Sequence, residues 1–116
     1  MAERRQIERR SISYYMRIVD AQANQLIGHL ADISVKGLKM DSQKPLPVGK
    51  KYRLRLNTTA DVADKDFIEF EACSKWCQLD PIEPVLFDIG FEITEIDPHD
   101  VGIVQNIVDK YGSRER

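Results

Sequence analysis

The sequence predicts a mainly β protein: a small six-stranded antiparallel β-barrel followed by one C-terminal α-helix. Three observations support this prediction. Short runs of alternating apolar and polar residues recur over residues 13–96, and turn-forming residues separate them. From Asp97 onward the apolar residues instead recur at the spacing of a helix. The length of 116 residues suits a single domain, and a hydrophobic content of 42% is enough for one modest core.

The first half of the barrel is expected to contain three strands. Residues 13–20 alternate, a turn follows at residues 21–25, and residues 26–33 form the second strand. A short third strand starts at Gly37, whose lack of a β-carbon permits a positive φ, a bulge or a close backbone approach. In the first strand Tyr14, Met16 and Ile18 share one face, and Tyr15, Arg17 and Val19 share the other. The residues expected to face inward after it are Ile33, Val35, Leu38 and Met40.

The second half of the barrel is expected to contain three more strands. Residues 51–57 and residues 67–77 alternate clearly, and the polar segment between them, residues 58–66, is predicted to be the exposed tip of a hairpin. A last alternating run covers residues 87–93. The residues expected to face inward are Tyr52, Leu54, Leu56, Ile68, Phe70, Ala72, Ser74, Trp76, Phe87, Ile89, Phe91 and Ile93.

One amphipathic helix is expected to close the barrel. Asp97 is a good N-cap, Pro98 suits the first helical position, and Gly112 is a natural C-cap. The apolar positions at helical spacing are Val101, Val104, Val108 and Tyr111. The expected single domain, residues 1–116, thus consists of an arginine-rich arm (1–12), the barrel (13–96) and the helix (97–112).

Charge narrows the class of ligand. The net charge of −2 argues against a protein that coats nucleic acids. The charge is uneven, because residues 1–17 carry five Arg against two Glu, or +3, which leaves −5 for the remainder. A basic arm on an acidic body favours one anionic ligand over a polyanion.

The remaining composition points to a cytoplasmic protein without a metal site or cofactor. No apolar run approaches the roughly 18–20 residues that a membrane span needs, and no signal peptide is visible. Cys73 and Cys77 are four residues apart, about 13 Å along a strand, which is too far for a disulfide within that strand. Two cysteines also make an incomplete zinc site, so both are interpreted as reduced thiols.

An arginine cluster near the N-terminus supplies the first motif, Arg4-Arg5-x-x-x-Arg9, with Arg10 beside it. Guanidinium groups are planar donor forks that suit phosphate oxygens and the O6/N7 edge of guanine, and they also stack on purine faces. The plainer interpretation of this segment is a basic tail that contacts nothing.

The second motif is Asp32-x-Ser34-x-x-Gly37. In an extended strand the side chains of Asp32 and Ser34 share one face, while Ile33 and Val35 face the core. A carboxylate and a hydroxyl on a common face are able to hold the polar edge of a ligand. Together with the arginines, this pair suits a guanine nucleotide.

In order and spacing the two motifs resemble the signature of PilZ domains, the bacterial receptors for cyclic di-GMP. A third feature of the resemblance is the strand with Trp76, followed by the run Phe87–Ile93 and the terminal helix. The resemblance implies a six-stranded barrel with a helix at one end and an arginine arm that closes over ligand on the barrel surface. By position, Arg5 and Arg9 would take the guanine and phosphate roles, with Arg4 as a helper.

The resemblance also implies the rest of the site and the kind of partner. Asp32 and Ser34 would contact a guanine edge, and Gly37 would keep the turn close to the ligand. The expected function is that of a cyclic di-GMP receptor, not an enzyme, that changes conformation and signals to a bacterial protein of the motility, pilus or exopolysaccharide machinery.

Other interpretations of the same residues stay open. A protein-interaction module could use the barrel and helix without nucleotide, although it would not need the arginines. A nucleic-acid-binding barrel is disfavoured by the acidic body. Trp76 is interpreted as a packing residue, with a place beside the ligand as the alternative. A hydrolytic set of His29, Asp32 and Ser34 is discounted, because residues five apart in one strand fall on opposite faces.

Overall fold

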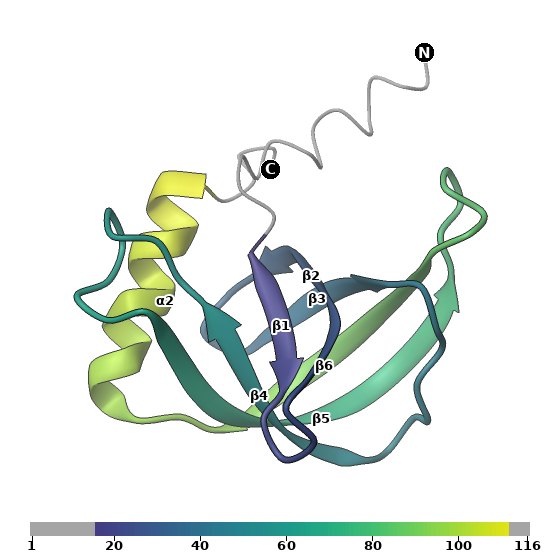
Figure 1. The fold of residues 1–116 in the computed structure, drawn as a ribbon, viewed down its shortest axis with the longest axis horizontal. Helices are drawn as coiled ribbons and strands as arrows, with labels where there is room; N and C mark the ends of the chain where they lie inside the picture. The colour runs from purple at the N-terminus through teal and green to yellow at the C-terminus, as the bar shows by residue number, and fades with distance from the viewer. Residues whose placement is uncertain (1–15, 112–116) are drawn as a thin grey trace.

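Residues 16–111, the part of the chain that the computed structural model describes, form six antiparallel strands that close into a barrel, with one helix at its end (Figure 1). The elements are β1 (Arg17–Asp20), β2 (Gln25–Ile33), β3 (Gly37–Ser42), β4 (Lys51–Asn57), β5 (Phe67–Leu79), β6 (Phe87–Glu95) and α2 (Pro98–Tyr111). Around the barrel the order is β1-β2-β3-β6-β5-β4, and pairing of β1 with β4 completes the closure. The predicted fold class is therefore confirmed.

The interior of the barrel is filled by the inward half of the alternating runs. Burying one face of each strand removes its apolar side chains from water, which is the main stabilising term in folding. The predicted inward residues that are buried are Ile33, Leu38, Met40, Tyr52, Leu54, Leu56, Ile68, Phe70, Ala72, Ser74, Ile89 and Phe91. In the first strand the buried face is that of Met16 and Ile18. Phe87 and Ile93 pack against this core while partly exposed. Tyr14 lies outside the described residues.

The prediction that Trp76 faces the core is wrong. The pairing of β5 with β6 shifts between Ser74 and Trp76, so the side chains of β5 change faces at this point. Ser74 is buried, and its hydroxyl donates to the carbonyl of Pro47 at 2.6 Å. After the shift Cys77 packs against the core, and the side chain of Trp76 is 41% exposed on the outer surface.

The interpretation of Val35 as a core residue is also wrong. Strand β2 ends at Ile33, and the next residues form a tight turn in which the amide of Ser34 donates to the carbonyl of Gly37 at 2.8 Å. The strand alternation stops there, and Val35 is 40% exposed.

The segment 58–66 is more than the exposed hairpin tip that the sequence predicts. Val62, within it, is only 3% exposed and belongs to the core. The side-chain amide of Asn106 on α2 donates to the carbonyl of Val62 at 3.0 Å, and the hydroxyl of Tyr111 bonds to Asp61. This loop and α2 therefore lie side by side at one end of the barrel, while the tip of the β5–β6 hairpin extends on the far side from the helix (Figure 1).

The helix begins as its capping residues predict. Asp97 accepts from the amide of His99 at 2.8 Å, which satisfies a donor at the start of the helix. Four residues bury the inner face of α2, namely Ile103, Val104, Ile107 and Tyr111, whereas Val101 and Val108 are half-buried. Gly112 lies outside the described residues. Between residues 16 and 111 no helix has the length and apolar character needed to cross a membrane.

Candidate functional site

Four neighbouring strands place one residue each in a row across the outer surface of the barrel. Asp32 on β2 is opposite Lys39 on β3, and Lys39 is opposite Gly90 on β6. Gly90 is in turn opposite Trp76 on β5. Residues directly opposite each other in adjacent strands have side chains about 5 Å apart, so this row forms one continuous surface.

A shallow hollow of about 490 Å³ lies along this row and takes in the turn that follows β2. Besides apolar residues and glycines, hydrogen-bond acceptors and cations line the hollow. The acceptors are the carboxylates of Asp32 and Glu92 and the hydroxyl of Ser34, and the cations are Lys36, Lys39 and Lys75. The hollow therefore offers acceptors for one part of a ligand and cations for an anionic part.

The indole of Trp76 packs directly on the backbone of Gly90. A β-carbon added at Gly90 would lie 2.3 Å from Cε2 and 2.4 Å from Nε1 of the ring, closer than real atoms approach. Only glycine leaves room for the ring in this position. With 41% of its side chain exposed, Trp76 gives the hollow an aromatic surface on which a flat ring is able to stack.

The turn from Asp32 to Gly37 is held by its own hydrogen bonds. Asp32 Oδ1 accepts from the amide of Ile33 at 3.0 Å, and Ser34 Oγ accepts from the amide of Lys36 at 3.2 Å. Because Oδ1 makes this local bond, the turn fixes the carboxylate of Asp32 while it remains exposed.

Gly37 serves a close backbone approach, one of the three roles that the sequence leaves open for it. A β-carbon there would lie 2.4 Å from the carbonyl oxygen of Phe91 on the neighbouring strand β6. A positive φ is not its role, since Gly49 is the glycine with a positive φ in the described part of the chain. Gly37 thus lets β3 and β6 meet at the edge of the hollow.

The structure brings together three of the six site residues that the sequence predicts. Asp32, Ser34 and Gly37 all border the hollow. The other three, Arg4, Arg5 and Arg9, lie outside the described residues. Sequence reasoning did not propose the lysines of the hollow, because their alternation with apolar residues is typical of any solvent-facing strand side.

A salt bridge shapes one side of the hollow. The ammonium group of Lys75 lies 3.6 Å from a carboxylate oxygen of Glu92, and both side chains are more than half exposed. Such a pair contributes little to stability, because water screens it and ordering two side chains is unfavourable. Its lysine is therefore available to an anion that binds in the hollow.

Comparisons with known proteins agree with this fold. The model of the PilZ domain family matches residues 3–110 of the chain. Among solved structures, the chain is similar to the Bacillus subtilis inhibitor of motility (MotI/DgrA), with a TM-score of 0.68 at 18% sequence identity. The match covers 84% of this chain and 46% of that chain, and at this identity it shows the fold alone. No curated protein matches the sequence.

Proposed function

The chain belongs to the PilZ domain family, and from this membership we propose that it is a receptor for cyclic di-GMP that binds the nucleotide in the hollow beside Trp76. The observation that carries the proposal is the joint lining of one hollow by Asp32, Ser34 and the exposed indole of Trp76. PilZ domains are binding modules, so the proposed protein is an effector and not an enzyme.

The chemistry of the hollow suits a guanine nucleotide. The N1–H and N2–H₂ groups of guanine are donors, and the carboxylate of Asp32 is an acceptor held in place by the turn. A guanine ring would stack on the indole of Trp76, a contact of about 1–3 kcal/mol per base. Lys36, Lys39 and Lys75 would stabilise the two phosphates.

The arginines of the N-terminal arm complete the proposed site. In this proposal Arg5 and Arg9 close over the bound nucleotide, with their guanidinium forks on the guanine O6/N7 edge and on phosphate oxygens, and Arg4 assists them. Residues 1–12, the arm, carry four Arg against two Glu, or +2, which matches the charge of a dianionic ligand.

Closing of the arm would convert binding into a signal. A segment that joins the barrel only when ligand is present changes the surface that the protein shows to a partner. The structural neighbour is named an inhibitor of motility, so we propose a cytoplasmic partner in the motility machinery, with pilus and exopolysaccharide proteins as further candidates.

The experiment is a titration read by the fluorescence of Trp76, which is the single tryptophan of the chain. Cyclic di-GMP is expected to change the emission in a saturable way, and calorimetry should give the same Kd. Cyclic di-AMP and GTP are the controls. Adenine presents an N6 donor where guanine presents the O6 acceptor, so cyclic di-AMP should bind at least tenfold more weakly.

Equal affinity for the two cyclic dinucleotides, or no response to cyclic di-GMP, would refute the proposal. The second result would favour an interaction module that works without nucleotide, and binding of a partner by the nucleotide-free protein would then be the next measurement.

A further inference from the structure

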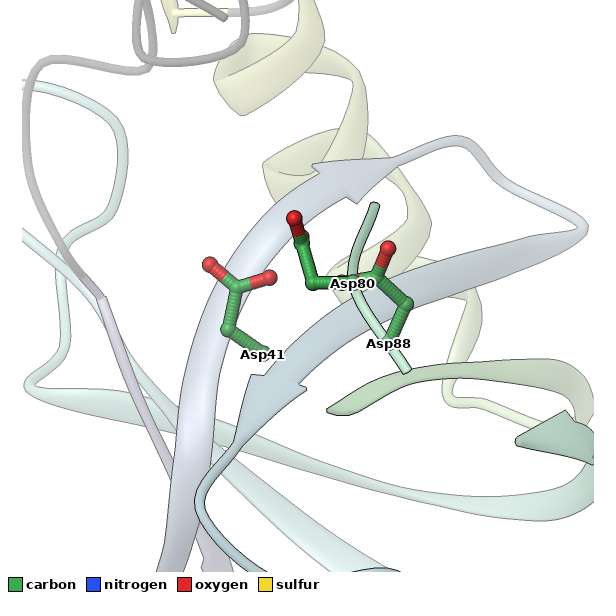
Figure 2. A group of neighbouring side chains, drawn as sticks. All are labelled: Asp41, Asp80 and Asp88. Carbon is green, nitrogen blue, oxygen red and sulfur yellow. The ribbon is translucent and has the colours of Figure 1, made fainter. Parts of the chain in front are cut away.

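Three carboxylates converge at the base of the β5–β6 hairpin, next to the hollow but outside it. Figure 2 shows Asp41 on β3, Asp88 on β6 and Asp80 directly after β5, with their side chains directed toward a common space. Oxygen atoms of the three groups all lie within 4.8 Å of one another. We call these residues the aspartate triad.

Backbone pairing fixes the position of each member. Asp41 and Asp88 are directly opposite each other in the β3–β6 pair. Asp80 is held by the hairpin loop, because its Oδ1 accepts from the amides of Ile82 and Glu83, both at 2.8 Å. Its own amide donates to the carbonyl of Leu86 at 2.9 Å. The triad is therefore built into the fold and does not depend on long, mobile side chains.

Burial makes such a group of ionised acids unfavourable unless a positive charge compensates it or a proton neutralises it. Asp88 is only 3% exposed and Asp80 5% exposed. Within residues 16–111 no hydrogen bond reaches Oδ1 of Asp88, although this atom is fully buried, and the side chain that carries it is directed toward the other two acids (Figure 2). A buried acceptor without a donor costs about 1–3 kcal/mol, and more when it is charged.

We propose that the aspartate triad binds a hard divalent cation, Ca²⁺ in the first place. Hard cations take oxygen ligands, and carboxylates from three separate elements supply them here. Ca²⁺ takes oxygen ligands at about 2.3–2.6 Å in flexible geometry, and three oxygens that all lie within 4.8 Å of one another are close enough together to share one such ion. Mg²⁺ loses its water ligands reluctantly, so a site built from the buried carboxylates of Asp80 and Asp88 suits it less well.

The cation site goes beyond nucleotide binding and does not depend on it. The pair Asp41–Asp88 lies two residues along the strands from the pair Lys39–Gly90, which belongs to the hollow. A cation in the triad would join β3, β6 and the hairpin loop beside the nucleotide, and so stabilise the barrel whether or not nucleotide is bound.

The test is thermal unfolding of chelator-treated, nucleotide-free protein with added CaCl₂ or MgCl₂ at constant ionic strength and pH 8. A Ca²⁺ concentration tenfold above Kd is expected to raise Tm by about 4–8 °C. Mg²⁺ should raise Tm less. Calorimetry with CaCl₂ should give one site per chain.

Two variants make the test specific. Asp88→Asn keeps the size of the side chain and is expected to abolish the Ca²⁺ effect on Tm; Asp41→Asn serves if Asp88→Asn does not fold. Glu83→Gln is the matched control, because it removes an exposed carboxylate from the same loop, and its response to Ca²⁺ should be unchanged. The proposal is overturned if neither cation shifts Tm of the unsubstituted protein, or if the shift persists in Asp88→Asn.

Discussion

Trp76 and Gly90 face each other across β5 and β6, and the indole occupies the space where any other residue at position 90 would carry its β-carbon. The pair explains how a large aromatic side chain stays on the outer surface in a defined position. Because the ring rests on backbone, its place depends on the absence of a single methyl group.

Gly90→Ala is therefore expected to displace the indole and weaken cyclic di-GMP binding about tenfold, since the stacking surface would no longer border the hollow in the same way. Tryptophan fluorescence and calorimetry measure the affinity for cyclic di-GMP. Gly102→Ala is the control, because nothing lies within 4 Å of a β-carbon added there on α2. The control should bind normally and gain about 0.5–1 kcal/mol of stability. Unchanged binding by Gly90→Ala would remove Trp76 from the site.

Single substitutions in the arm should separate binding from folding. Arg5→Ala or Arg9→Ala is expected to lower affinity about ten- to a hundredfold, since a hydrogen bond to a charged group contributes about 1.5–3 kcal/mol. Tm of the nucleotide-free protein should stay the same. Arg10→Ala is the neighbouring control and should have a smaller effect. A large fall in Tm without nucleotide would contradict the role proposed for these arginines.

Asp32→Ala is expected to weaken binding as well, because it removes the acceptor for guanine N1–H and N2–H₂. The exposed carboxylate accepts a hydrogen bond from the adjacent amide of Ile33 and is not part of the core, so the free energy of unfolding should change little. Calorimetry measures affinity, and chemical denaturation measures stability. A substitution that destabilises the fold and leaves affinity intact would show that Asp32 only shapes the turn.

Val62 is expected to matter for stability although it lies in a polar loop. Val62→Ala should lower the free energy of unfolding by about 1–3 kcal/mol, because the side chain is buried between barrel and helix. Val85→Ala, at a position that is 72% exposed, is the control and should change stability by less than about 0.5 kcal/mol. Denaturation in urea measures the free energy of unfolding of both variants. Equal effects would contradict the conclusion that Val62 belongs to the core.

The regular parts of this fold follow from local patterns. Alternation over residues 51–57 predicts that Tyr52, Leu54 and Leu56 are buried, and the structure agrees. The capping residue Asp97 likewise marks the start of α2 within one residue. These patterns are readable because each depends only on neighbours in the chain.

The residues whose positions the sequence did not predict are placed by contacts with segments that are distant in the chain. The shift between Ser74 and Trp76 is defined by the register of β5 against β6, and no local pattern contains it. The burial of Val62 depends on α2, which is far away in sequence. The aspartate triad was not predicted for the same reason, since Asp41 and Asp88 are brought together only by the β3–β6 register.

The titration of Asp88 gives a final prediction, on the dependence of stability on pH. Burial raises the pKa of the Asp88 carboxyl from 3.8 to about 7. The hydrogen bond that the protonated carboxyl donates to Asp80 and the charges of Asp80 and Asp41 add to the rise, and the charge of Lys39 opposes it. Between pH 3.8 and about pH 7 the folded protein therefore holds a proton on Asp88 that the unfolded chain has released. The contribution of Asp88 to stability is therefore fully present below pH 4 and is lost as pH rises through about 7.

In chelator, the free energy of unfolding of the unsubstituted protein minus that of Asp88→Asn should thus fall between about pH 4 and pH 7 and level off above pH 7, since the asparagine has no proton to lose. Taking the difference removes the titration of groups that both proteins share, to the extent that they do not interact with Asp88. Denaturation in urea at each pH measures the free energy of unfolding. A difference for Asp88→Asn that does not change with pH would mean that the carboxyl stays ionised in the folded protein, and that Lys39 or another cation already compensates its charge.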